Sequence, residues 1–214
     1  MNRNPSPEEL LNNSDYELMN EVEYSNLKPF IFDEIGQRSL IITFYGIFQT
    51  LALVILIGIL LFYSVGLIKN GLYKTEMQTI GFSVLFSFTL LIPIHELIHA
   101  AAFFALGKRD IGFGMQWKKF LFYAESNRQV LNRKEMIIVA LAPFLTVLIT
   151  GLGCFFFSPS KVVSLSGLVI VLLHFMFCGG DFAIISFFNR YKKFKLYTFD
   201  DRKEKRSYYF KKLS

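Results

Sequence analysis

Long apolar runs separated by short polar segments dominate the chain. Each of the four runs exceeds the roughly 20 residues that a helix needs to cross a bilayer: 39–68, 78–106, 136–158 and 162–189. A short "SPSK" turn at 158–161 joins the third and fourth runs, as expected for a helical hairpin. The pattern predicts an all-α polytopic membrane protein with about four transmembrane helices.

The segment before the first run, residues 1–38, is polar and carries a helix-start signature. Ser6-Pro7-Glu8-Glu9 provides an N-cap, a first-turn proline and a capping-box glutamate. This predicts a short acidic amphipathic helix whose apolar positions are Leu10, Leu11, Leu18 and Val22. A disordered tail is the alternative. The segment lacks the features of a secretory signal, so the first run is expected to remain as a membrane anchor.

The 107–135 loop alternates large apolar residues with small or polar ones, starting at Ile111, Phe113, Met115 and Trp117. Period-two alternation predicts a short β-hairpin at the membrane surface, between the second and third spans. Its exposed edge could hold an extended peptide by strand addition. A hairpin that only caps the helix bundle is the equal alternative.

Composition and charge support this topology. The chain is 53% hydrophobic and carries a net charge of +6. Of its Lys and Arg residues, 20 lie in the segments on one side of the predicted spans and 3 on the other. The positive-inside rule therefore places both termini and the hairpin in the cytoplasm, in what we expect to be a bacterial plasma membrane. We interpret residues 39–189 as the transmembrane domain and 190–214 as a basic cytoplasmic tail that contacts anionic lipid.

Two other classes of site find no support in the sequence. The charge comes without a recognisable nucleic-acid motif, so we expect no nucleic-acid partner. Cys154 and Cys178 both lie in apolar runs, which favours buried small hydrophobic side chains over a disulfide or a thiolate zinc site.

Ionisable side chains inside the spans gather on the second and fourth. Apart from Lys161 at a turn, the spans hold only two acidic or basic residues, Glu96 and Asp181. The three histidines, His95, His99 and His174, also lie in these two spans. Such groups are costly in a membrane and usually mark functional sites or buried pairs.

His95-Glu96-Leu97-Ile98-His99 matches the H-E-x-x-H pattern of zinc sites. Residues four apart share one helix face, so two imidazoles can bind one ion with Glu96 beside its water. The alternative is a polar seam in which these side chains satisfy one another between helices.

A catalytic zinc needs a third protein ligand, and Asp181 is the better candidate. At 1.5 Å per residue, the motif and Asp181 both lie roughly 12–14 Å below the cytoplasmic ends of their helices, whereas His174 lies about 10 Å deeper. His174 shares a helix face with Asp181 and remains an accessory candidate. It could orient a ligand, stabilise an oxyanion or, the reading we favour slightly, bond to another helix.

With these motifs the chain resembles the small membrane proteins described as zincin peptidases, which are similar to the site-2 intramembrane metalloproteases. The resemblance covers about residues 80–190 and rests on "HELIHAAAF", the hairpin region, "LAPF" and "GGD". It implies that His95, His99 and Asp181 bind Zn²⁺ and that Glu96 is the catalytic base.

The sequence therefore predicts an integral membrane zinc metallopeptidase that cleaves a transmembrane or membrane-proximal peptide near the cytoplasmic face. The rival is a non-catalytic membrane protein, a partner subunit or a resistance or immunity factor, with a structural or vestigial metal site. A metal transporter is disfavoured because no chain of polar residues continues across the outer half of the spans.

Overall fold

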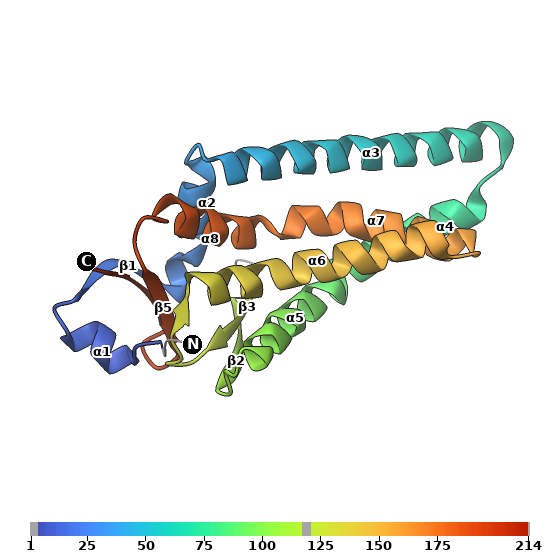
Figure 1. The fold of residues 1–214 in the computed structure, drawn as a ribbon. Coiled ribbons are helices and arrows are strands. Elements are labelled where there is room, and N and C mark those ends of the chain that lie inside the picture. Colours follow the sequence, from blue (N-terminus) through green and yellow to red (C-terminus); the bar gives the residue numbers. More distant parts are fainter. Residues whose placement is uncertain (1–3, 117–120, 214) are drawn as a thin grey trace. The chain divides into compact units, whose positions relative to one another are not determined.

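The computed structural model describes residues 4–116 and 121–213, and most of the chain is helical (Figure 1). The chain forms two compact units. One, the sheet unit, comprises Met1–Ile42, Glu96–Ala142 and Gly180–Ser214. The other, the helical unit, comprises Thr43–His95 and Pro143–Gly179.

The four apolar runs form helices, but two of the runs are broken. Two helices are by themselves long and apolar enough to cross a membrane: α3 (Leu40–Asn70) and α6 (Arg133–Phe157). Each of the other runs is a bent pair: α4 (Lys74–Thr89) with α5 (Leu91–Ala105), and α7 (Lys161–Phe177) with α8 (Gly179–Arg190). Residues 4–116 and 121–213 thus hold two candidate spans, or four if each pair counts as one.

The helical unit is held together by an apolar cluster and by close backbone contact. Ala52 and Leu56 of α3 and Ile80 of α4 pack with buried residues of α7. In Figure 1, α6 and α7 run side by side. Two glycines allow this approach, because a Cβ on Gly167 would lie 2.6 Å from the carbonyl oxygen of Gly151. Small residues serve the same purpose at membrane helix interfaces.

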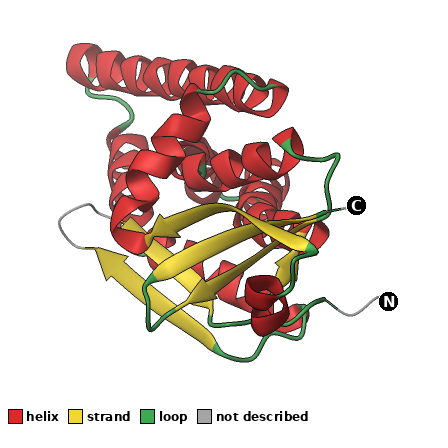
Figure 2. Cartoon of the chain, turned by 90° about the vertical axis from the view of Figure 1, so that its left-hand side faces the viewer, coloured by secondary structure: helices red, strands yellow, loops and turns green. Residues whose placement is uncertain are grey.

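In the sheet unit, the prediction of an all-α fold is wrong. Four antiparallel strands form one sheet in the order β1-β6-β5-β4 (Figure 2): β1 (Tyr16–Glu23), β4 (Leu131–Asn132), β5 (Leu196–Asp201) and β6 (Arg206–Lys212). Residues 190–214, which the sequence presents only as a basic tail, supply two of these strands.

The sheet buries side chains on both faces. Tyr208 and Phe210 of β6 pack with Leu10 of the short helix α1 (Pro7–Asn12). The intervening Tyr209 packs with residues of α8, among them Phe187. Because side chains alternate between faces along a strand, β6 contributes to both apolar clusters. The run "SYYF" therefore lacks the simple alternation of apolar and polar residues that identifies a one-sided strand.

The N-terminal segment confirms the predicted helix start but not the predicted helix length. The Ser6 hydroxyl accepts from the Glu9 N–H (3.1 Å), and the Glu9 carboxylate accepts from the Ser6 N–H (2.6 Å). The helix ends at Asn12, and Leu18 and Val22 lie on β1 instead. A 3₁₀ turn (Tyr24–Asn26) and α2 (Leu27–Gly36) follow.

Charge complementarity accompanies the pairing of β1 with β6. Glu17 lies opposite Lys211, and their side chains form an ion pair at 2.9 Å. Glu23 lies opposite Arg206, and their side chains form an ion pair at 3.1 Å. Opposite charges directly across a strand pair stabilise it modestly. Two basic residues of the C-terminal segment, Arg206 and Lys211, therefore form ion pairs with the N-terminal strand.

The predicted hairpin is confirmed as the antiparallel pair β2 (Ile111–Gln116) and β3 (Leu121–Ser126), with Phe113 opposite Ala124. Trp117, which belongs to the predicted alternation, lies outside the described residues.

Asp200 at the end of β5 makes the stability of the sheet unit pH-dependent. Burial raises the pKa of its carboxyl to about 6, the Glu125 carboxylate acts in the same direction, and the Ser207 hydroxyl, which donates at 2.6 Å, opposes the shift. In an unfolded chain the Asp pKa is about 3.9. Between these values the folded protein binds more protons than the unfolded one. The free energy of unfolding therefore falls as pH rises from about 4 to about 6.

We expect Asp200→Asn to remove this part of the pH dependence. Thermal midpoints of detergent-solubilised protein, followed by circular dichroism between pH 4 and 7, measure it. Asp15→Asn at an exposed turn is the matched control and should retain the wild-type slope. An unchanged slope in Asp200→Asn would assign the dependence to other groups.

Candidate metal centre

Helix α5 carries the three residues of the zinc motif. The helix is continuous from Leu91 to Ala105, so His95 and His99 lie one turn apart on one face, as the spacing predicts. The break that precedes α5 lies at Leu90. It lies three residues before Pro93, which has no N–H to continue the hydrogen bonds of α4 into α5.

His99 and Asp181 meet within the sheet unit. Both side chains are buried, and His99 Nε2 lies 3.2 Å from Asp181 Oδ1. His99 Nδ1 lies 2.9 Å from the carbonyl oxygen of Val139 on α6. A carbonyl only accepts, so Nδ1 carries the proton in this contact and Nε2 is the nitrogen directed at Asp181. This hydrogen bond fixes the ring as outer partners of metal-binding histidines do.

The donor set of this pair fits a zinc ion. Zinc binds histidine nitrogen and carboxylate oxygen at about 2.0–2.2 Å, usually as a tetrahedron. Two ligand atoms of such a tetrahedron lie roughly 3.3 Å apart. The distance of 3.2 Å between His99 Nε2 and Asp181 Oδ1 matches this separation. The separation fits two ligands of one zinc ion, and it equally fits a direct hydrogen bond between the two side chains.

Glu96 is held by the hairpin. The backbone N–H of Ala124 on β3 donates to Glu96 Oε2 at 2.7 Å, and the Glu96 side chain is half-buried. Because this N–H is directed at α5, it does not point toward Phe113, the partner of Ala124 on β2. The hairpin thus orients the carboxylate of the predicted catalytic base.

The C-terminal segment in turn holds the hairpin. Arg202, in the turn after β5, bonds to Glu125 of β3, and its Nη1 donates to Oδ1 of Asp110, the residue just before β2, at 3.1 Å. Its guanidinium covers Gly112, where a Cβ would lie 2.4 Å from it. Glu125 also accepts from the hydroxyl of Tyr24. Both strands of the hairpin are therefore tied to segments outside the apolar helices.

His95 contacts His174 within the helical unit. Both rings are buried, and His95 Nδ1 lies 3.0 Å from His174 Nε2. From the sequence, His174 is expected to lie about 10 Å deeper than the zinc motif. That estimate is wrong for His95, because the two rings are in contact. It treated each span as one straight helix, but α7 ends at Phe177. The reading of His174 as a hydrogen-bonding partner of another helix agrees with this contact.

Sequence reasoning missed three groups around these residues. The carbonyl of Val139 and the N–H of Ala124 are backbone groups, so no side-chain pattern could indicate them. Cys178, taken as a small apolar side chain, lies with its sulfur 3.6 Å from His174 Nδ1. The four-residue spacing from His174 was a usable signal for this contact. The assignment of His95, His99 and Asp181 as ligands, of Glu96 as base and of His174 as accessory remains a prediction.

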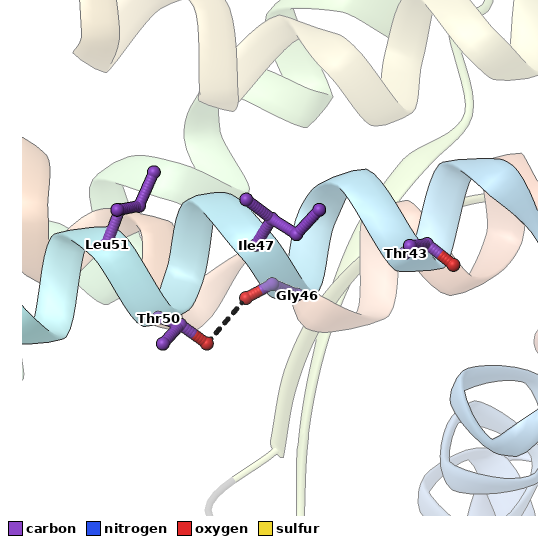
Figure 3. A pocket seen from close by; sticks show the side chains of 5 residues that line it. All are labelled: Thr43, Gly46, Ile47, Thr50 and Leu51. Carbon is purple, nitrogen blue, oxygen red and sulfur yellow. Dashed lines mark hydrogen bonds between the residues drawn. The ribbon is translucent and has the colours of Figure 1, made fainter.

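A shallow hollow along α3 is a poor alternative site. Figure 3 shows its lining, which is Thr43, Gly46, Ile47, Thr50 and Leu51, all from one helix. The Thr50 hydroxyl donates to the Gly46 carbonyl at 2.8 Å. None of the five residues is titratable, so the hollow offers neither a metal donor set nor a general base.

Comparison with known families agrees with the chemistry of these residues. A family model described as "Putative zincin peptidase" matches residues 88–195, half of the chain. The chain belongs to this family. The matched stretch of this family member contains His95, Glu96, His99, His174 and Asp181. Comparisons with curated proteins and with solved structures gave no significant match.

Metal content tests the predicted ligands. We expect purified wild-type protein to bind about one zinc per chain. His95→Ala and Asp181→Ala should weaken zinc binding by more than the roughly 10–100-fold that changes in outer partners cost. His174→Ala should retain zinc at saturation with a lower affinity. Equilibrium dialysis with elemental analysis measures all three.

Asp33→Ala, at an exposed position on α2, is the control and should bind zinc as the wild type does. Full zinc in Asp181→Ala together with its loss in His174→Ala would show that the fourth apolar run contributes the histidine rather than the carboxylate.

Proposed function

We propose that the protein is an integral membrane zinc metallopeptidase of the site-2 type. Its substrate would be a transmembrane or membrane-proximal peptide, cut near the cytoplasmic face. The contact between His99 and Asp181 carries this proposal. His99 lies on α5, the helix that also presents Glu96, and Asp181 lies on α8. The contact brings a carboxylate to one motif histidine, His99; together with His95, one turn earlier on α5, these residues would supply the His₂-carboxylate set found in catalytic zinc sites.

Family membership and the apolar helices support the two parts of the proposal separately. The zincin peptidase family supports peptide hydrolysis with zinc. The two to four candidate spans support insertion in a membrane. The excess of Lys and Arg on one side supports cytoplasmic termini and a site that opens toward the cytoplasm.

The predicted zinc ligands and Glu96 would have separate roles in peptide hydrolysis. A bound zinc ion would polarise the scissile carbonyl and activate a water molecule. His95, His99 and Asp181 would hold this ion. Glu96 would accept the proton from the attacking water and deliver it to the leaving amine. The N–H of Ala124 keeps the Glu96 carboxylate in place for both transfers.

The β3 edge of the hairpin is the proposed substrate-binding edge. In an antiparallel pair the N–H and C=O of one residue point to the same side. The Ala124 N–H is directed at Glu96, so the Ala124 carbonyl also lies on the side away from β2. Because the Ala124 N–H donates to Glu96, an extended peptide at this edge would pair with the Ala124 carbonyl and place its backbone beside Glu96.

Glu96→Gln separates catalysis from metal binding. Gln keeps an oxygen that can accept from the Ala124 N–H but cannot act as a base, so cleavage should be lost while zinc content is retained. Single-span model substrates with a tag at each end, co-reconstituted with the enzyme in liposomes, report cleavage by fragment size. Full activity of Glu96→Gln would overturn the mechanism.

The same experiment addresses the rival function. A non-catalytic partner subunit or resistance or immunity factor with a structural or vestigial metal site would bind zinc and cleave none of the substrates, and its phenotype would survive Glu96→Gln.

Ala124→Pro tests the hydrogen bond from the hairpin. Proline removes the N–H, and this N–H is not part of the β2–β3 ladder, so the strand pairing should persist. Cleavage should fall on the order of 10–100-fold with unchanged zinc content. Ala124→Val keeps the N–H and is the matched control. Equal activity of the two variants would show that Glu96 is oriented by other contacts.

A further inference from the structure

Three exposed lysines follow α8 within one short, ordered turn of the sheet unit. They are Lys192, Lys193 and Lys195, and Phe194 between them is also exposed, with 44% of its surface accessible. The backbone N–H groups of Lys192 and Phe194 each donate to the carbonyl three residues back, at 3.2 and 3.0 Å. The backbone N–H of Lys212 donates to the carbonyl of Lys195 at 2.9 Å. Hydrogen bonds therefore fix the backbone from which the three lysines project.

The three lysines differ from several other basic residues of the C-terminal segment in having no acidic partner. Ion pairs with acidic side chains are made by Arg190, Arg202, Arg206 and Lys211. Within residues 4–116 and 121–213, no carboxylate forms an ion pair with any of the three lysines in the turn after α8. Their positive charge is therefore not compensated at close range by the protein and can attract an anionic partner.

The turn lies where apolar helices end. The apolar sequence of α8 ends at Phe188, and the next residue, Asn189, accepts from the guanidinium of Arg133 at the start of α6 (3.1 Å). Arg190 bonds to Glu34 of α2, the helix that precedes α3. The ends of helices that cross a bilayer lie near the lipid headgroups, where basic residues are common. The three lysines directly follow this level in the chain.

We propose that Lys192, Lys193 and Lys195 bind the headgroups of anionic phospholipids, with Phe194 in contact with the lipid beside them. The ammonium groups supply the charge that attracts an anionic membrane surface, and an exposed aromatic ring suits the boundary between headgroups and acyl chains. The inference depends on insertion in a membrane and not on catalysis. It confines the lipid contact expected of the whole 190–214 segment to the turn after α8, because β5 and β6 take up much of the remainder.

Lipid binding to the full-length protein in detergent tests this inference. Native mass spectrometry measures the affinities for phosphatidylglycerol, which is anionic, and for phosphatidylcholine, which has no net charge. We expect the wild type to bind phosphatidylglycerol more tightly. A basic residue near an anionic surface contributes roughly 5-fold in affinity, so Lys192→Gln/Lys193→Gln should reduce this preference on the order of 25-fold.

Two further double variants control for fold and for net charge. Lys192→Arg/Lys193→Arg keeps both charges and should bind lipid as the wild type does. Lys203→Gln/Lys205→Gln removes two exposed charges from the turn between β5 and β6. The length of β5 places that turn roughly 20 Å from Lys195, so the lipid preference should be retained.

Three results would overturn the inference. The first is equal preference for phosphatidylglycerol in the wild type and in Lys192→Gln/Lys193→Gln. The second is an equal loss in Lys203→Gln/Lys205→Gln, which would show an effect of net charge alone. The third is displacement of phosphatidylglycerol from the wild type by a duplex oligonucleotide at lower concentration, which would assign the lysines to nucleic acid. Failure to cleave any substrate would count against the proposed function alone.

Discussion

Polar side chains buried in apolar helices need partners within the protein, because neither lipid nor a dry core provides water to solvate them. The buried ionisable groups of this protein meet that requirement at close range. His99 contacts Asp181 and the Val139 carbonyl, and His95 contacts His174. The Val139 carbonyl only accepts, so it also fixes the nitrogen that His99 directs at Asp181. The hydrogen bonds that satisfy these buried groups thus also orient the side chains that the sequence predicts as metal ligands.

The breaks in two apolar runs matter for the same reason. Asp181 lies in the first turn of α8, where the unpaired backbone N–H groups of a helix start favour a negative charge. In the middle of a continuous span the carboxylate would lack this stabilisation. The start of α8 thus stabilises a carboxylate within an otherwise apolar run. Cys178 directly follows the last residue of α7, and the four-residue helical spacing places its sulfur 3.6 Å from Nδ1 of His174.

The segments outside the apolar runs are part of the site's support. The acidic strand β1 and the basic strand β6 pair with each other, which joins the two ends of the chain in one sheet. Arg202, from the turn that links β5 to β6, then secures the hairpin through Glu125. The hairpin in its turn donates the Ala124 N–H to Glu96. Residues near the C-terminus therefore influence the position of the predicted catalytic base.

The sequence by itself determined the local features of this protein: the helices, the capping box at Ser6, the hairpin and the shared face of His95 and His99. Each depends on backbone geometry over a few residues, which periodicity and spacing reveal. Tertiary structure decided the sheet and the partners of the site. The contact of His95 with His174 joins residues 79 positions apart, and strand β1 pairs with a strand near the other end of the chain. Such contacts depend on how whole elements pack, because burial on both faces of a strand and breaks within a span leave no periodic signal.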